Sequence, residues 1–146
     1  MSLTTLSLQA YLSTACGGTL TAAGLDGSTT SAAWLGPIAA GVRSLGLALV
    51  DPLSAVDADL VPVVASQVDQ LLDVAELRAL ENALNHYTKV SQKISMGEKR
   101  FGEFRTELEA TIARKSTSVM NQYGIGLATI SAGVIDLAFD SVDSTA

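Results

Sequence analysis

Apolar residues recur at helical spacing in three segments of this chain. Two are long, residues 67–90 and 98–123, and each places its apolar side chains at i, i+3, i+4 and i+7. The third, residues 31–47, begins with Ser31 and carries Pro37 in its first turn, where the missing N–H of proline costs little. Because this spacing is typical of amphipathic helices, the pattern predicts a helix in each segment.

The two long helices are expected to form an antiparallel hairpin. Residues 91–97 break the periodicity and are the predicted connection, and Gly124 follows Tyr123 as a natural stop for the second helix. Two carboxylates at residues 57–59 predict a short helix that begins there. The hairpin stripe is narrow, so residues 31–47 or other subunits must complete the core. The predicted core residues of the hairpin are Leu71, Leu72, Leu80, Leu84, Phe101, Phe104, Leu108 and Ile112.

Both ends of the chain lack such a pattern. Residues 1–30 are rich in Gly, Ser and Thr, and their few leucines are compatible with a short helix or a strand. We therefore expect an extended N-terminal arm at 1–30 and a helical domain at 31–123. The predicted fold class is all-α, an antiparallel helical hairpin or small helical bundle.

The C-terminal segment 124–146 has a mixed, period-2 order of polar and apolar residues, and its glycines disfavour a helix. It is expected to be extended or β-forming. Alone it would expose an apolar edge, which favours pairing with another subunit or protein. The residues predicted to dock on that partner are Ile125, Leu127, Ile130, Val134, Ile135, Leu137 and Phe139.

Charge is concentrated in the helical middle of the chain. Only 16% of the 146 residues are charged, against about 25% in soluble domains. Residues 67–123 hold eight charges of each sign, whereas 1–66 and 124–146 each carry a net −3. The low charge therefore belongs to the two ends and indicates surface kept for partners. The total of −6 argues against a protein that grips nucleic acid through its phosphates.

The sequence predicts no membrane segment and no targeting signal. The first 25 residues hold no charged side chain, so the basic region of a secretory signal is missing. No run reaches the 18 to 20 apolar residues, roughly, that cross a bilayer. Synthesis in the cytoplasm is expected.

No catalytic, cofactor-binding or metal site is predicted. Cys16 and His86 are each the only residue of their kind, which excludes a cysteine-rich zinc site, a multi-histidine site and an intrachain disulfide. A Cys16–His86 catalytic pair is the enzyme alternative, although no motif surrounds Cys16. We interpret Cys16 as a sheltered thiol and His86 as a residue on the surface of a helix. The pair Arg114 and Lys115 is interpreted as a helix end that faces water.

Several segments of the sequence together carry a resemblance to a known class of proteins. They are LGLALVDP at 45–52, VDADL at 56–60, LLDVAELRALENALN at 71–85 and NQYG at 121–124. Over about residues 40–124 the chain resembles the small head-to-tail connector (adaptor) and neck proteins of tailed bacteriophages.

The resemblance implies a structural protein of the virion that needs no cofactor. It implies a homo-oligomeric ring, commonly of twelve subunits, that lies beneath the portal protein and above downstream neck or tail proteins. The C-terminal tails would reach the portal. Double-stranded DNA would pass through the channel without sequence-specific binding, because an acidic wall repels phosphate.

Two other interpretations remain beside the connector and the enzyme. One is a different structural protein of the phage neck or tail. The other is a secreted helical-hairpin protein of the Trp-x-Gly class, since Trp34, Leu35 and Gly36 match that tripeptide. In that class the tripeptide lies between the two long helices, whereas here it precedes both, and Leu127 stands where an acidic residue should follow Tyr123.

Overall fold

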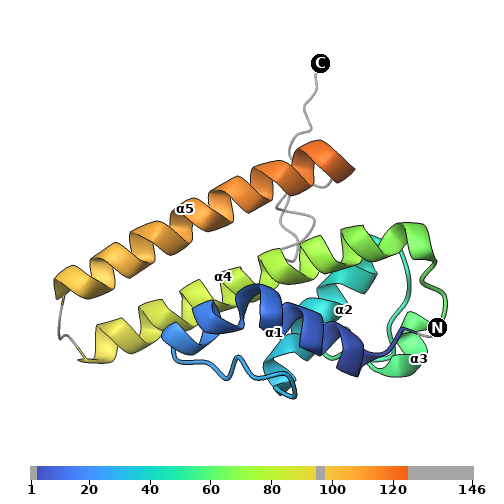
Figure 1. The fold of residues 1–146 in the computed structure, drawn as a ribbon, viewed down its shortest axis with the longest axis horizontal. Coiled ribbons are helices and arrows are strands. Elements are labelled where there is room, and N and C mark those ends of the chain that lie inside the picture. The colour runs from blue at the N-terminus through green and yellow to red at the C-terminus, as the bar shows by residue number, and fades with distance from the viewer. Residues whose placement is uncertain (1–2, 95–97, 125–146) are drawn as a thin grey trace.

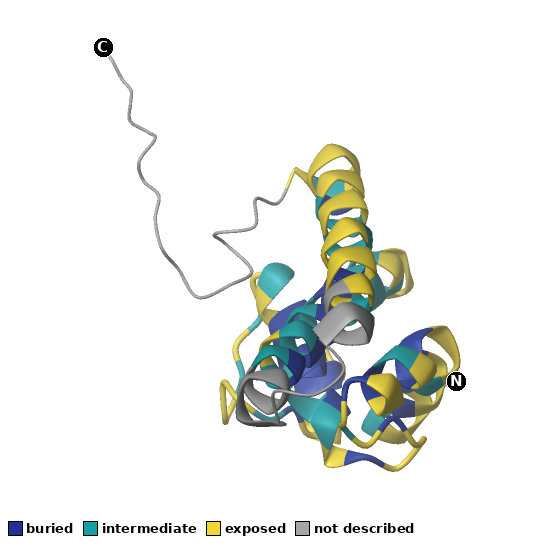
Figure 2. Ribbon diagram, turned by 90° about the vertical axis from the view of Figure 1, so that its left-hand side faces the viewer, coloured by how far each residue is buried: buried dark blue, intermediate teal, exposed yellow. Residues whose placement is uncertain are grey.

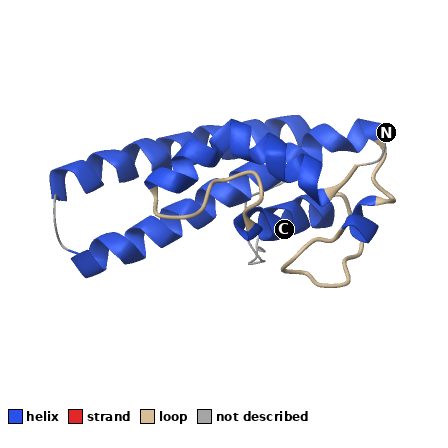
Figure 3. Ribbon diagram, turned by 60° about the horizontal axis from the view of Figure 1, so that its bottom comes forward, coloured by secondary structure: helices blue, strands red, loops and turns tan. Residues whose placement is uncertain are grey.

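The computed structural model describes residues 3–94 and 98–124, without the side chains of 89–102, and these residues form a small all-α bundle. Its helices are α1 (Thr5–Ala22), α2 (Leu35–Ser44), α3 (Asp57–Leu60), α4 (Val68–Ile94) and α5 (Glu98–Tyr123). Two short 3-10 turns, Ala32–Trp34 and Ala65–Gln67, precede α2 and α4. No strand occurs in the described part (Figure 3). The predicted all-α bundle is confirmed.

Helix α4 lies at the centre of the bundle. In Figure 1, α1, α2 and α3 lie on one side of α4 and α5 lies along the other. The packing of α2 on α4 is the most extensive, followed by that of α5 and then of α1 on the same helix. The later residues of α5 meet the earlier residues of α4, so the two helices run antiparallel.

Local sequence signals predicted most helix ends correctly. Helix α5 spans the predicted residues, and Gly124 follows it with a φ of +70°. Ser31 caps the turn before α2, because its hydroxyl accepts a hydrogen bond from the Ala33 N–H at 3.1 Å. The short helix predicted at Asp57 is α3. Helix α4 continues to Ile94, however, so part of the predicted connection at 91–97 is helical.

The prediction of an extended N-terminal arm is wrong. Residues Thr5–Ala22 form α1, which is kinked at Cys16, and they bury one apolar side chain per turn: Leu8, Leu12, Cys16 and Leu20. A capping box between Thr4 and Ser7 starts the helix. The weak helix propensity of Gly, Ser and Thr argued against a helix in this segment. Burial of the apolar side chains against α4 stabilises the helix and outweighs that propensity.

The main core lies between α1, α2 and α4, and α5 closes one side of it. Trp34 is fully buried, and its indole N–H donates to the Ser28 carbonyl at 2.8 Å. Of the predicted core residues, Leu71, Leu80 and Leu108 are buried, whereas Leu72, Leu84, Phe104 and Ile112 are half-buried against the same core. The side chain of Phe101 lies outside the described part.

Gly41 allows α2 to lie close to α4. A Cβ atom at this position would lie 2.5 Å from the Leu71 backbone oxygen, too close for two non-bonded atoms. Gly36, in the same helix, differs, because a Cβ atom there would lie 3.4 Å from the Leu53 carbonyl oxygen, an ordinary contact. The spacing between the two most extensively packed helices therefore depends on the missing side chain at Gly41.

We expect Gly41→Ala to lower the free energy of unfolding by about 1–3 kcal/mol, because α2 must move away from α4. Gly36→Ala is the matched control, and its change should lie within about 1 kcal/mol of zero, because the gain in helix propensity opposes the crowding of a new Cβ against Pro37. Urea unfolding followed by circular dichroism measures both. Equal free energies for the two variants would show that the close approach at Gly41 does not limit the packing.

Candidate functional site

A cluster of polar side chains fastens the last turns of α5 to α4. The ammonium group of Lys115 lies 3.0 Å from a carboxylate oxygen of Asp73 and 3.3 Å from one of Glu76. The Tyr123 hydroxyl donates a hydrogen bond to the other Asp73 oxygen at 2.6 Å. All four side chains are half-buried. We call these four residues the α4–α5 clamp.

The clamp changes the ionisation of two of its members. Partial burial alone would lower the pKa of Lys115, but its hydrogen bonds to Asp73 and Glu76 and their negative charges outweigh this effect and raise that pKa. Burial, the hydrogen bond to Asp73 and the charges of Asp73 and Asp69 raise the pKa of Tyr123 well above its ordinary value. Both residues are therefore held in their protonated forms, in which each can donate to the carboxylates.

Sequence reasoning did not find the clamp, and it placed Lys115 at a helix end that faces water. Arg114 is exposed as expected, but Lys115 packs against α4. Asp73 and Glu76 lie on a polar face of α4, and the spacing along this helix gives no sign that they have a partner. Only the register of the two helices, which spacing along one helix does not specify, brings these groups together.

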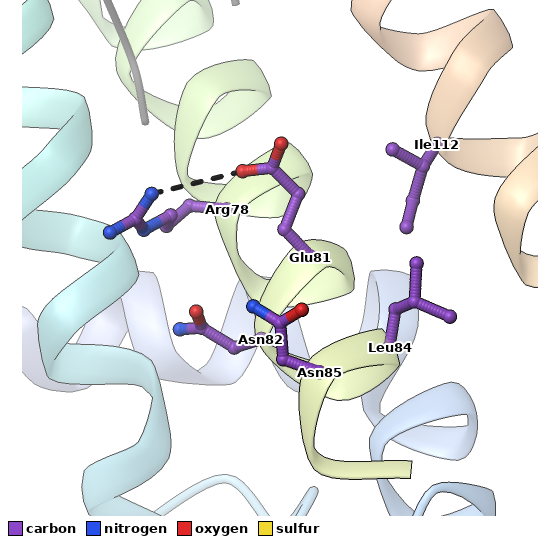
Figure 4. Close-up of a pocket in the computed structure, with 6 residues that line it drawn as sticks. All are labelled: Arg78, Glu81, Asn82, Leu84, Asn85 and Ile112. Carbon is purple, nitrogen blue, oxygen red and sulfur yellow. Dashed lines mark ion pairs between the residues drawn. The ribbon is translucent and has the colours of Figure 1, made fainter. Parts of the chain in front are cut away.

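A row of polar residues runs along α4 beyond the clamp, towards the C-terminal end of the helix. One hollow lies on each side of this row. The row comprises Arg78, Glu81, Asn82, Asn85 and His86, which are spaced for one face of a helix. The hollow towards α5 has a volume of about 390 Å³, with Leu84 and Ile112 facing each other across it and an ion pair of 3.9 Å between Arg78 and Glu81 (Figure 4). The hollow towards α1, of about 420 Å³, reaches Leu20 and Leu25 and is bordered by His86.

Cys16 and His86 occupy different kinds of environment. Cys16 is buried in the main core, and this burial, with a smaller effect of the nearby Glu76 carboxylate, raises the pKa of its thiol to about 12. A thiol that stays protonated at neutral pH is a poor nucleophile. His86 is half-buried beside Gly24 at the edge of the second hollow. The interpretation of Cys16 as a sheltered thiol is confirmed.

The docking residues Ile125, Leu127, Ile130, Val134, Ile135, Leu137 and Phe139 lie outside the described residues. In residues 3–94 and 98–124, no group of three or more His, Cys, Asp or Glu side chains is placed to hold a metal ion. None of the helices within these ranges is long and apolar enough to cross a membrane. Trp34 of the Trp-x-Gly tripeptide is a core residue.

Comparison of the chain with protein-family models, with curated proteins and with solved structures found no match.

The clamp predicts an alkaline loss of stability. A group whose pKa is higher in the folded than in the unfolded state stabilises the fold fully below its unfolded pKa, which is about 10 for Tyr and Lys. This contribution is lost as the pH rises through the folded pKa. Above about pH 10, therefore, the unfolded chain releases the Tyr123 proton while the folded chain keeps it, because a phenolate beside the Asp73 carboxylate is unfavourable, and the free energy of unfolding falls.

We expect Tyr123→Phe to lower the free energy of unfolding by about 1–2 kcal/mol at neutral pH and to make its further fall between about pH 9 and 11 shallower. The matched control is Tyr11→Phe on the exposed face of α1, with a change within about 0.5 kcal/mol. Urea unfolding at several pH values measures both. Parallel pH profiles for Tyr123→Phe and the parent protein would contradict the assignment.

Proposed function

We propose that this chain is the subunit of a head-to-tail connector ring in a tailed bacteriophage, which joins the portal to the neck or tail and lines the DNA channel. The proposal rests on the resemblance over residues 40–124. One observation of the structure supports it most strongly: α5 packs mainly on α4 and leaves its outer face uncovered along the described residues (Figure 2).

The outer face of α5 has the pattern of a helix–helix seam. Five exposed residues without charge recur at alternating steps of four and three, and we call them the α5 stripe: Thr106, Ala110, Ala113, Thr117 and Met120. This is the spacing of a coiled-coil contact, and small residues allow a second helix to approach closely.

Charged residues border the α5 stripe on both sides. Glu103, Glu107 and Arg114 follow one edge, and Arg105 and Glu109 follow the other, where they form an ion pair of 3.5 Å. In coiled coils such flanking charges select the partner and its orientation. A ring needs two different contact surfaces on each subunit, and in this proposal the α5 stripe supplies one of them and packs against another helix of the neighbouring copy.

The charge of the chain is compatible with a channel through which DNA moves. The total is −6, and in residues 103–123, the part of α5 with described side chains, the exposed face carries Glu103, Glu107 and Glu109 against Arg105 and Arg114. A wall with this balance gives phosphates no continuous row of cations to bind, so DNA would pass without being held.

In this proposal the helical hairpin of α4 and α5 forms the wall of the ring, and residues 124–146 form the tail that docks on the portal. The subunit would be made in the host cytoplasm and would end at the head-to-tail interface of the virion. A different neck or tail protein would use the same stripe, so the level of the ring in the particle decides between these two candidates.

We expect Thr117→Glu to abolish ring formation while the subunit stays folded, because it places a charge in the seam between copies. Ser118→Glu is the matched control, since it changes the neighbouring exposed hydroxyl residue by the same charge but lies about 100° further around the helix. Co-expression with the portal followed by native mass spectrometry measures the assembly.

Reconstruction of an intact particle would then give the copy number and the level of the subunit. A parent protein that stays monomeric with its portal and is absent from particles would overturn the proposed function. A parent ring that Thr117→Glu leaves intact would instead remove the α5 stripe from the interface.

A further inference from the structure

An apolar groove lies at the end of the bundle where α1 begins and α3 ends. It has a volume of about 560 Å³, and apolar side chains make up most of its lining: Leu3, Leu60, Val61, Val63, Ala65 and Val68. Val61 is 81% exposed, and Leu6 and Val64 add exposed apolar surface from the same segments. Exposed apolar surface of this kind is costly in water unless something covers it.

The groove has a fixed shape in the described structure. The carboxylate of Asp57 accepts hydrogen bonds from the backbone N–H and the hydroxyl of Thr5 at 2.8 Å and 2.9 Å, which ties the start of α1 to the start of α3. Asp59, buried in α3, accepts a hydrogen bond from the Val56 N–H at 3.0 Å. The two sides of the groove are therefore held together without an occupant.

The described chain ends close to this groove. The Tyr123 hydroxyl is hydrogen-bonded to Asp73. Asp73 lies five residues, or about 8 Å along the axis of α4, from Val68 in the groove lining. A chain that leaves Gly124 has to pass around α4, a distance of about one helix diameter, 10–12 Å. About five or six extended residues cover both distances, so residues 130–135 come within reach of the groove.

The charges around the groove indicate which part of the C-terminal segment can bind in it. Asp57 and Asp69 are exposed carboxylates next to lining segments of the groove, so an acidic occupant would be repelled. Residues 125–135 hold no charged side chain and include five branched aliphatic residues, whereas Asp136, Asp140 and Asp143 follow them. The uncharged part of the tail matches the groove, and the acidic part does not.

We infer that residues 125–135 of the same chain bind in the apolar groove of the free subunit. A tethered segment of this length has an effective concentration of roughly millimolar, so a modest apolar contact is enough to hold it. The inference concerns the chain before any assembly and does not depend on the proposed function. If the tail also docks on a larger partner, that partner has to displace it from the groove.

Disulfide trapping in the full chain tests this inference. One variant carries Val61→Cys in the groove and Val134→Cys in the tail. The control carries Met120→Cys with the same tail cysteine, because Met120 is exposed on α5 only four residues before Gly124. Both pairs are oxidised with oxidised glutathione at low protein concentration, and the products are separated on non-reducing gels. Cys16 stays in place, since it is buried in the core.

Random collisions favour the control pair, whose cysteines are closer along the chain. Binding in the groove reverses this order, and we expect the Val61 pair to form its intrachain disulfide about tenfold faster than the Met120 pair. Adding Ala65→Asp, which puts a carboxylate on an exposed lining position, should remove that preference and leave the Met120 pair unchanged.

Three results would overturn the inference. Equal or slower trapping of the Val61 pair would mean that the tail does not occupy the groove. Disulfide-linked dimers that increase with protein concentration would assign the groove to the tail of a second copy. A preference that survives Ala65→Asp would place the tail near Val61 but outside the groove. Each result leaves the ring proposal standing, because that proposal is tested through Thr117 and the portal.

Discussion

The burial of α4 on several sides is the constraint on which the rest of the structure depends. Leu71, Ala75 and Ala79 belong to the main core with residues of α1 and α2, and Val74 and Leu77 form a second apolar cluster with Ala40 of α2 and Val119 of α5. A single helix cannot shield all of these positions, so three helices surround it. The missing side chain at Gly41 lets α2 approach α4 closely.

This arrangement leaves α5 in a special position. It shares the core through one stripe and is fastened at its last turns by Lys115 and Tyr123 on Asp73. Its outer face remains available for a second helix. The clamp therefore has two effects, since it aligns this outer face and it also fixes the position of Gly124, the last described residue.

The proposed function and the inferred tail contact both follow from surface that the isolated subunit does not cover. The α5 stripe is uncharged and has helical spacing, which suits a helix of a neighbouring copy. The groove near α3 is apolar and lies among carboxylates, which suits an uncharged extended segment. The two surfaces differ in shape and in charge, so each selects a different kind of partner.

The sequence by itself determined the helices whose apolar residues repeat without interruption, together with their ends at Ser31, Asp57 and Gly124. It failed for α1, because Gly, Ser and Thr have weak helix propensity and only burial against α4 makes that helix stable. It also gave the sheltered character of Cys16, but not the site around Lys115. Spacing along one helix specifies a face, whereas the partner of that face depends on the register between helices. Only the tertiary structure decided that register, and with it the clamp, the hollows along α4 and the apolar groove.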